Sequence, residues 1–163
     1  MESRIYSFAP VLSSASQILI LGSIPGAQSL AMNQYYAHPQ NQFWKIIFEL
    51  LAVPYTTDYP QRIAVLQQHG IALWDVIESC ERKGSLDATI KNEAVHNLHE
   101  VLARAPHIKS IYCNGQKSYQ TTLKVLGKDF RLPIKPLPST SPLHTIPYQE
   151  KLKVWQQILN DLG

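Results

Sequence analysis

The chain has 163 residues, of which 45% are hydrophobic and 17% charged, so it fits one globular domain over residues 1–163 and is not intrinsically disordered. The net charge is +3, but residues 1–81 hold three basic against six acidic residues and residues 82–163 hold twelve against six; the basic half fits either a polyanion-binding surface or ordinary solvated helix faces. Short apolar runs and only two cysteines, Cys80 and Cys113, exclude a membrane span and a four-cysteine metal site, and favour a cytoplasmic protein with reduced thiols and no secretory signal.

The first half of the chain predicts two buried strands, two helices and a long loop. Residues 17–21 and 71–76 are short apolar runs, as expected for strands that are covered on both faces. Residues 43–51 have apolar side chains at helical spacing, and residues 60–69 begin with proline and end before a glycine, which is typical of a helix. Residues 22–41 carry Gly, Pro, Ser and Asn and predict a long loop with room for one helical turn, a kind of segment that is often functional.

Helices and strands continue to alternate in the second half. The helix expected at residues 95–105 has Val95 on its apolar face. The strand expected at residues 131–137 contains two prolines, which places it at a sheet edge. The remaining elements are a strand at residues 107–113 and helices at residues 116–126 and 147–162.

This order predicts an α/β protein, a three-layer α/β/α sandwich around a central four-stranded parallel sheet. In such sheets, ligands bind beyond the carboxyl ends of the strands. The segments that follow the predicted strands are residues 22–41, 74–75, 114–117 and 138–144. We therefore expect these four segments to form the functional site.

Several residues in these segments suit binding or catalysis, and each also has a purely structural explanation. Residues 22–26, Gly-Ser-Ile-Pro-Gly, allow either close approach of backbone N–H groups to a ligand or a plain tight turn. Tyr35 and Tyr36 suit stacking on a base or packing of the loop. Asn41 precedes a helix, where it is a favoured N-cap, and capping would use the same side-chain oxygen as catalysis. The hydroxyls of residues 138–144 could donate to phosphate oxygens or form a polar turn.

Other chemistries lack their motifs. The glycines after the first strand have neither the dinucleotide-binding nor the phosphate-loop spacing, and there is no GxSxG sequence for serine hydrolysis. The six histidines are scattered without metal-ligand spacing. We expect no metal and no cofactor.

Three segments, in this order, resemble the uracil-DNA glycosylase superfamily. Residues 22–26 are similar to its first motif, and residues 36–44, Tyr-Ala-His-Pro-Gln-Asn-Gln-Phe-Trp, are similar to the segment that follows it in the mismatch-specific uracil and thymine glycosylases. Residues 139–143, Ser-Thr-Ser-Pro-Leu, resemble the second motif, the loop that intercalates into DNA. The resemblance covers residues 18–147 and implies a single domain of that fold that removes a damaged base from DNA.

Two departures from the family pattern point to one branch of it. Ile24 stands where the first motif usually has a water-activating Asp or Asn, and Ser139 stands where the second motif usually begins with His or Asn. This combination resembles the hypoxanthine-DNA (deoxyinosine) glycosylases, in which an Asn outside the first motif is thought to be catalytic. The matching residue is Asn41, which the resemblance makes the leading catalytic candidate.

The resemblance implies roles for the remaining site residues. Asn41 would hold the attacking water, the backbone N–H of Ser23 or Ile24 would bind the base oxygen, and Tyr36 would stack on the extruded base. Asp75 would read the base edge, although capping of a helix is an alternative role for it.

Two further residues would set the pocket size and the DNA conformation. Gly26 has no side chain where uracil-restricted relatives have a tyrosine, which leaves room for a purine, and Leu143 would fill the gap left by the extruded base. The residues expected to hold DNA phosphates are Lys117, Ser139, Thr140 and Ser141.

Two other functions remain open. The same fold could act on uracil, or on thymine opposite guanine. A non-catalytic DNA-binding homologue is the alternative from another class, favoured by the missing Asp or Asn of the first motif. In each case the partner is DNA, no membrane is involved, and we expect a monomer.

Overall fold

Four parallel strands lie at the centre of the protein, which the computed structural model describes over residues 4–163. They are β2 (Ile18–Gly22), β3 (Ile71–Asp75), β6 (Ser110–Asn114) and β7 (Ile134–Leu137), in the order β3-β2-β6-β7. Every residue of β2, β3 and β6 is buried. The four predicted strands are confirmed, including the place of the proline-containing strand at the sheet edge. The first three residues of the predicted domain lie outside the described range.

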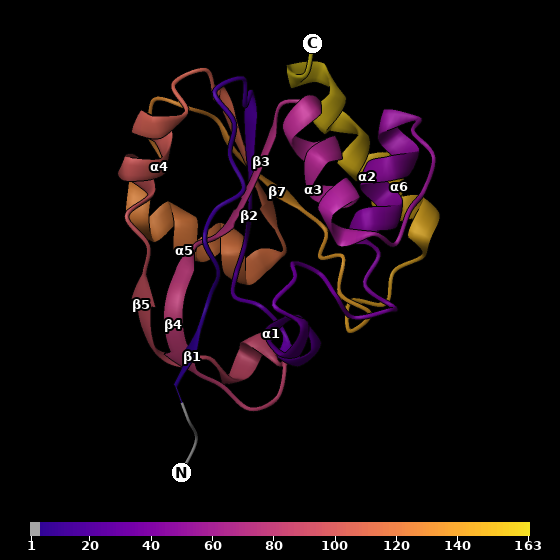
Figure 1. Ribbon diagram of the computed structural model, residues 1–163. Coiled ribbons are helices and arrows are strands. Elements are labelled where there is room, and N and C mark those ends of the chain that lie inside the picture. The colour runs from indigo at the N-terminus through magenta and orange to yellow at the C-terminus, as the bar shows by residue number, and fades with distance from the viewer. Residues whose placement is uncertain (1–3) are drawn as a thin grey trace.

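Helices cover both faces of this sheet (Figure 1). One layer contains α2 (Phe43–Leu51), α3 (Tyr59–Gln68) and α6 (Tyr148–Trp155), which continues as the 3-10 helix η2 (Gln156–Asp161). The other layer contains α4 (Leu98–Arg104) and α5 (Gln116–Leu126). The predicted three-layer sandwich is therefore confirmed.

Alternation along β2 explains why there are two hydrophobic cores. Ile18 and Ile20 pack with the first helix layer, whereas Leu19 and Leu21 pack with the second. Successive side chains of a strand point to opposite faces, so an uninterrupted apolar run is what a strand between two helix layers requires.

A second, antiparallel sheet was not predicted. It consists of β1 (Ile5–Tyr6), β4 (Ile77–Glu81) and β5 (Lys91–Val95), in the order β1-β4-β5. The short 3-10 helix η1 (Asp87–Thr89) lies between β4 and β5. The chain thus passes from the central sheet at β3 almost directly into the second sheet.

The predicted start of the helix at residues 95–105 is wrong. Val95 does not lie on the apolar face of a helix: it ends β5, pairs with Ile77, and is 42% exposed. The helix begins only at Leu98, after the N-cap Asn97. The backbone of residues 91–95 is held by pairing with β4, and this cross-strand contact overrides the helical spacing of the side chains.

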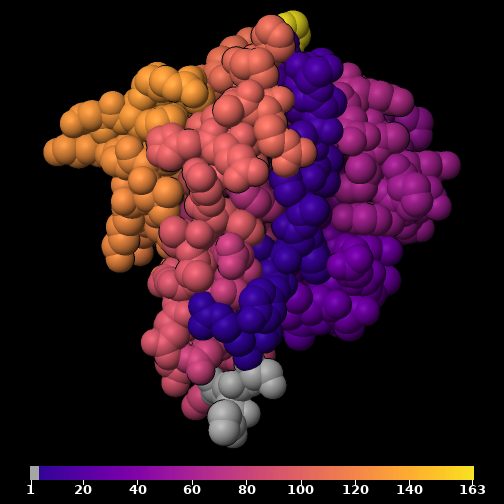
Figure 2. All heavy atoms as spheres, turned by 60° about the vertical axis from the view of Figure 1, so that its left-hand side comes forward, coloured from indigo at the N-terminus to yellow at the C-terminus, as the bar shows by residue number. Residues whose placement is uncertain are grey.

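The segment before β2 covers the outer edge of the central sheet. Val11 forms an antiparallel bridge with Leu73 of β3, with N···O distances of 2.8 and 3.0 Å. Figure 2 shows this N-terminal segment, in indigo, running over the surface of the protein. Pairing of this kind protects an edge strand from other chains.

The predicted loop after β2 contains the single short helix α1 (Ala27–Met32). It lies below the carboxyl ends of the central strands in Figure 1, close to η1. No helix within residues 4–163 is long and apolar enough to cross a bilayer.

Candidate active site

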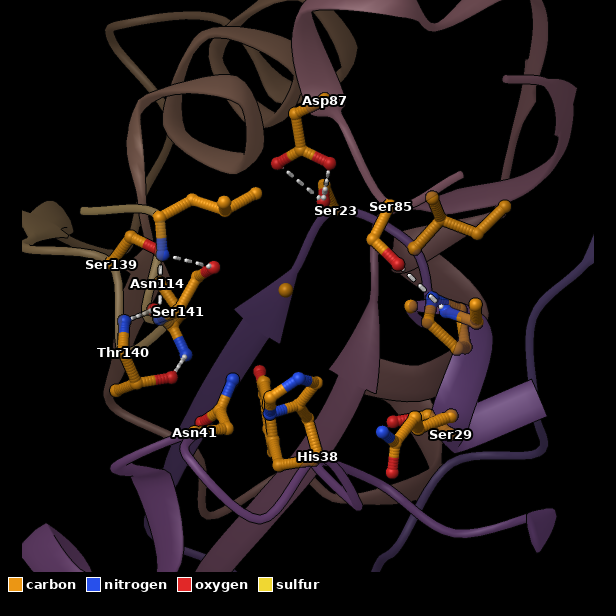
Figure 3. Close-up of a pocket in the computed structure, with 18 of the residues that line it drawn as sticks. Ser23, Ser29, His38, Asn41, Ser85, Asp87, Asn114, Ser139, Thr140 and Ser141 are labelled. Atoms are coloured by element: carbon orange, nitrogen blue, oxygen red, sulfur yellow. Dashed lines mark hydrogen bonds between the residues drawn. The ribbon is translucent and has the colours of Figure 1, made fainter. Parts of the chain in front are cut away.

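A cavity of about 460 Å³ lies at the carboxyl ends of β2, β3 and β6. All four segments predicted from the strand ends contribute to its lining, which was the main expectation for the site. A fifth contribution, from residues 82–87, was not expected. The polar lining residues labelled in Figure 3 are Ser23, Ser29, His38, Asn41, Ser85, Asp87, Asn114, Ser139, Thr140 and Ser141.

Gly22 leaves room for two buried polar groups on the cavity wall. It is the last residue of β2 and lies opposite Asp75 in the parallel register. A Cβ atom at this position would overlap Asp75 Oδ1 and would lie only 2.8 Å from the Tyr36 hydroxyl oxygen. Both side chains therefore depend on a glycine at this strand end.

Asp75 is a buried carboxyl group with unused hydrogen-bonding capacity. It is 3% exposed, and its Oδ2 has no hydrogen-bond partner among the described residues. Burial raises the pKa of Asp75 to about 7; the nearby Asp87 also raises this pKa, whereas Arg82 lowers it. A group of this kind at neutral pH can accept or donate a hydrogen bond, and perturbed groups in a cavity mark candidate functional sites. The main chain runs from Asp75 into β4, so capping of a helix is not its role here.

Tyr36 forms part of the cavity with its ring held from one side. The ring stacks on Phe43 with a centroid distance of 4.2 Å, and the residue has a positive φ of 53°. Its hydroxyl oxygen is buried, without a hydrogen-bond partner in the described part of the chain, and burial raises its pKa. Because Tyr36 also lines the cavity, it is placed to contact a ligand there.

Asn41 contacts both the cavity and the start of α2. Asn41 precedes the N-cap of α2, Gln42. Asn41 Oδ1 accepts a hydrogen bond from the backbone N–H of Phe43 at 3.0 Å. The oxygen that catalysis would use is thus already a hydrogen-bond acceptor, although Gln42 and not Asn41 is the N-cap of α2. A carbonyl oxygen has a second lone pair, however, and Figure 3 shows the Asn41 side chain at the cavity wall.

The turn after β2 presents backbone donors. Neither the N–H of Ser23 nor that of Ile24 donates a hydrogen bond to another residue within residues 4–163. The Ile24 side chain is 6% exposed and packs in the second core, so it contributes no polar group. Gly26 precedes α1, and a Cβ atom there would lie 3.2 Å from Ser85 Oγ. The two free N–H groups fit the predicted binding of an anionic oxygen.

Hydrogen bonds to Asn114 and within the loop hold residues 138–144. Thr140 is buried, its N–H donates to Asn114 Oδ1, and its Oγ1 accepts from Asn114 Nδ2, both at 3.0 Å. Ser139 Oγ accepts from the N–H of Ser141, and Ser141 Oγ accepts from the N–H of Leu143, both at 3.1 Å. The hydroxyl protons of the two serines remain available to a phosphate, whereas the Thr140 side chain holds the loop in place.

Two other predicted DNA contacts differ in their surroundings. Leu143 is 61% exposed and lines the cavity, as a side chain that inserts into DNA requires. Lys117 lies near the start of α5, outside the cavity lining, and its Nζ is 2.8 Å from Glu93 Oε1. Its phosphate contact therefore stays a prediction.

Sequence reasoning missed Arg82, Ser85 and Asp87 of the cavity wall. They follow β4, a strand that was not predicted, and no motif marks them. Asn114 was within an expected segment, but nothing in the sequence indicated its bonds to Thr140. Within residues 4–163, no group of three or more His, Cys, Asp or Glu side chains could hold a metal ion.

Comparison with known proteins supports the family that the sequence motifs indicate. The sequence pattern that defines the Uracil DNA glycosylase superfamily matches residues 9–163. A hypoxanthine DNA glycosylase of Methanosarcina barkeri (strain Fusaro / DSM 804) is 34% identical over 128 residues, which cover 77% of this chain and 81% of the relative. A hypoxanthine DNA glycosylase of Methanosarcina acetivorans is 31% identical over 137 residues, covering 82% and 84% of the two chains.

A solved structure has the same fold over nearly the whole chain. The solution NMR structure of a Methanosarcina acetivorans protein, provisionally described as a uracil DNA glycosylase, superposes with a TM-score of 0.82 at 28% identity and covers 96% of each chain. The family expected from the motifs is thereby confirmed: this chain belongs to the uracil DNA glycosylase superfamily.

Proposed function

We propose that this protein is a DNA glycosylase that hydrolyses the N-glycosidic bond of a deaminated base, and that its preferred base is hypoxanthine. The observation that carries the choice of base is the buried Asp75, whose Oδ2 lacks a partner among the described residues. The two relatives named hypoxanthine DNA glycosylase support the same choice. We further propose that DNA is the partner and that the protein is a monomer. A cytoplasmic location is also proposed, because Cys80 and Cys113 are buried free thiols.

Asp75 explains how hypoxanthine would be distinguished from adenine. Hypoxanthine carries a proton on N1 and an oxygen on C6, whereas adenine has no N1 proton. The ionised Asp75 carboxylate accepts from N1–H, and the backbone N–H groups of Ser23 and Ile24 donate to the base oxygen. Gly26 leaves space for the purine, and Tyr36 contacts its ring.

The reaction needs one water and stabilisation of two charges. The bond between C1′ and the base nitrogen breaks with its electron pair going to the base, which leaves a cationic sugar. Asn41 positions water through the second lone pair of Oδ1; the water oxygen bonds to C1′, and its released proton neutralises the departing base. The N–H groups of Ser23 and Ile24 stabilise the negative charge that develops on the base.

The remaining contacts keep the nucleotide outside the duplex. Leu143 fills the gap in the base stack, which offsets part of the unstacking cost of a few kcal/mol. Ser139, Ser141 and Lys117 contact phosphates, and Thr140 holds the loop that carries the two serines. Loss of Lys117 is expected to weaken binding to all sequences alike and to reduce its salt dependence.

Incubation with end-labelled duplexes tests the proposal. Each duplex carries one deoxyinosine, one deoxyuridine or one thymine–guanine mispair, and alkali cleaves the strand wherever a base has been removed. We expect cleavage at deoxyinosine that Asn41→Ala slows about 100-fold. Cleavage at uracil or thymine alone would assign the other substrate class, and binding without cleavage of any duplex would establish a non-catalytic homologue.

A further inference from the structure

The segment of residues 82–87 forms one wall of the cavity and is fixed to the turn after β2. It follows β4 and runs close to α1 (Figure 1). Three contacts hold it: the Ser23 hydroxyl lies 3.0 Å from both carboxylate oxygens of Asp87, Arg82 Nη2 donates to Pro25 O at 2.7 Å, and the N–H of Ala27 donates to Ser85 Oγ at 2.9 Å.

Asp87 is the more exposed of the two carboxyl groups on the cavity lining, as the structure describes it. Its side chain is 47% exposed. Asp75 is buried beside Gly22, and the Arg82 side chain is 1% exposed, with its guanidinium bonded to the carbonyls of Pro25 and Gly84. Arg82 Nη1 lies 4.0 Å from Asp87 Oδ1 and offsets part of its charge, so a substrate in the cavity would meet a partly compensated negative charge at Asp87.

Cleavage of an N-glycosidic bond places positive charge on the sugar, and a nearby carboxylate stabilises such charge. Asn41 is neutral and cannot stabilise the positive charge in this way. In Figure 3, Asp87 and Asn41 lie at opposite sides of the cavity. We propose that Asp87 is a further catalytic residue, whose carboxylate faces the deoxyribose and stabilises its positive charge while the bond to the base breaks. This inference rests on the proposed glycosylase function.

The role is electrostatic, so Asp87 forms no covalent bond and keeps its charge throughout the reaction. The electron pair of the broken bond goes to the base, and the water oxygen bonds to C1′, as described above. The Ser23 hydroxyl lies 3.0 Å from both carboxylate oxygens and holds the carboxylate at the cavity wall. A group fixed before the reaction begins stabilises charge without the cost of reorganisation.

The charges around Asp87 decide its ionisation. Partial burial raises the pKa of Asp87, whereas the hydrogen bond from Ser23 and the positive charges of Arg82 and Lys117 lower it. Asp75 is the other carboxyl group that interacts with it. Because only the ionised form stabilises a cation, the rate should fall as acid protonates Asp87.

Asp87→Asn tests the charge while keeping an oxygen that accepts from Ser23. Under single-turnover conditions, with the deoxyinosine duplex, we expect the rate to fall about 100-fold, with the dissociation constant for that duplex changed less than about threefold. Asp87→Glu, which keeps the charge, should restore part of the rate. A merely structural role would not give a loss of rate at unchanged affinity that the charge-conserving variant restores.

Thr89→Val is the matched control. The Thr89 hydroxyl donates to Leu86 O at 2.7 Å and accepts from the N–H of Lys83 at 3.0 Å, so its loss loosens the same segment without changing a charge in the cavity. Equal rates for Asp87→Asn and wild type, or equal losses in Asp87→Asn and Thr89→Val, would overturn the inference. An inactive wild-type protein would instead overturn the proposed function, and the inference with it.

Discussion

Asn114 and Thr140 hold each other through two hydrogen bonds of 3.0 Å, although they are 26 positions apart in the chain. The Asn114 side chain accepts from the backbone N–H of Thr140 and donates to its hydroxyl oxygen. Asn114 ends β6, and Thr140 lies in the loop that carries Leu143. The carbonyl of Thr140 also accepts from the N–H of Gln42, at the start of α2. One buried pair thus joins the central sheet, the proposed DNA-binding loop and the helix that follows Asn41.

Asn114→Ala is expected to remove both bonds and lower the free energy of unfolding by about 2 kcal/mol, whereas Thr140→Val loses one bond and about 1 kcal/mol. Urea unfolding measures both values. We also expect Asn114→Ala to bind the deoxyinosine duplex more weakly than Thr140→Val, because the loop loses its backbone contact. Equal affinity of both variants and wild type would mean that the pair does not position the loop.

The central sheet could be predicted because its strands are continuous apolar runs, and the strand ends in turn placed Ser23, Asn41 and Asp75 at one site. The second sheet could not be predicted in this way. Residues 91–95, Lys-Asn-Glu-Ala-Val, are mostly exposed, and their strand conformation depends on pairing with β4. Asp87 was missed for the same reason, because its place beside Ser23 is set by contacts between distant segments and by no local pattern.

Asn41→Ser separates the helix contact of this residue from its proposed catalytic role. A serine hydroxyl can still accept from the N–H of Phe43, so the unfolding free energy should stay close to that of wild type. Asn41→Ala is expected to lose about 1 kcal/mol. Both variants should excise hypoxanthine about 100-fold more slowly, because neither holds water at the position of the amide oxygen. Wild-type activity of Asn41→Ser would contradict the catalytic assignment.

Asp75 should make stability depend on pH. Its pKa is raised to about 7 in the folded protein, above the value of about 3.9 expected in the unfolded chain. The folded state therefore binds more protons between about pH 4 and pH 7, and the contribution of Asp75 to stability falls as pH rises through that range, by at most about 1.4 kcal/mol per unit. Asp75→Asn should remove this dependence.

Urea unfolding of wild type and Asp75→Asn at several pH values between 4.5 and 7.5 measures the difference. Subtraction of the two curves cancels the effect of carboxylates that do not interact with Asp75, whereas the interaction with Asp87 stays in the difference. A difference that does not change with pH would mean that Asp75 has an ordinary pKa in the folded protein.

Leu143→Ala should affect excision from duplex DNA without affecting the fold. Leu143 is 61% exposed, and substitutions of exposed side chains usually change stability by less than about 0.5 kcal/mol. On duplexes with deoxyinosine we expect at least about a tenfold loss of activity, because nothing would fill the space left by the extruded base. A single strand has no such gap, so its cleavage should be unchanged. Val154→Ala, at an exposed position of α6 outside the cavity lining, serves as control. An equal loss on single and double strands would show that Leu143 contacts the substrate in some way other than by replacing the base in the stack.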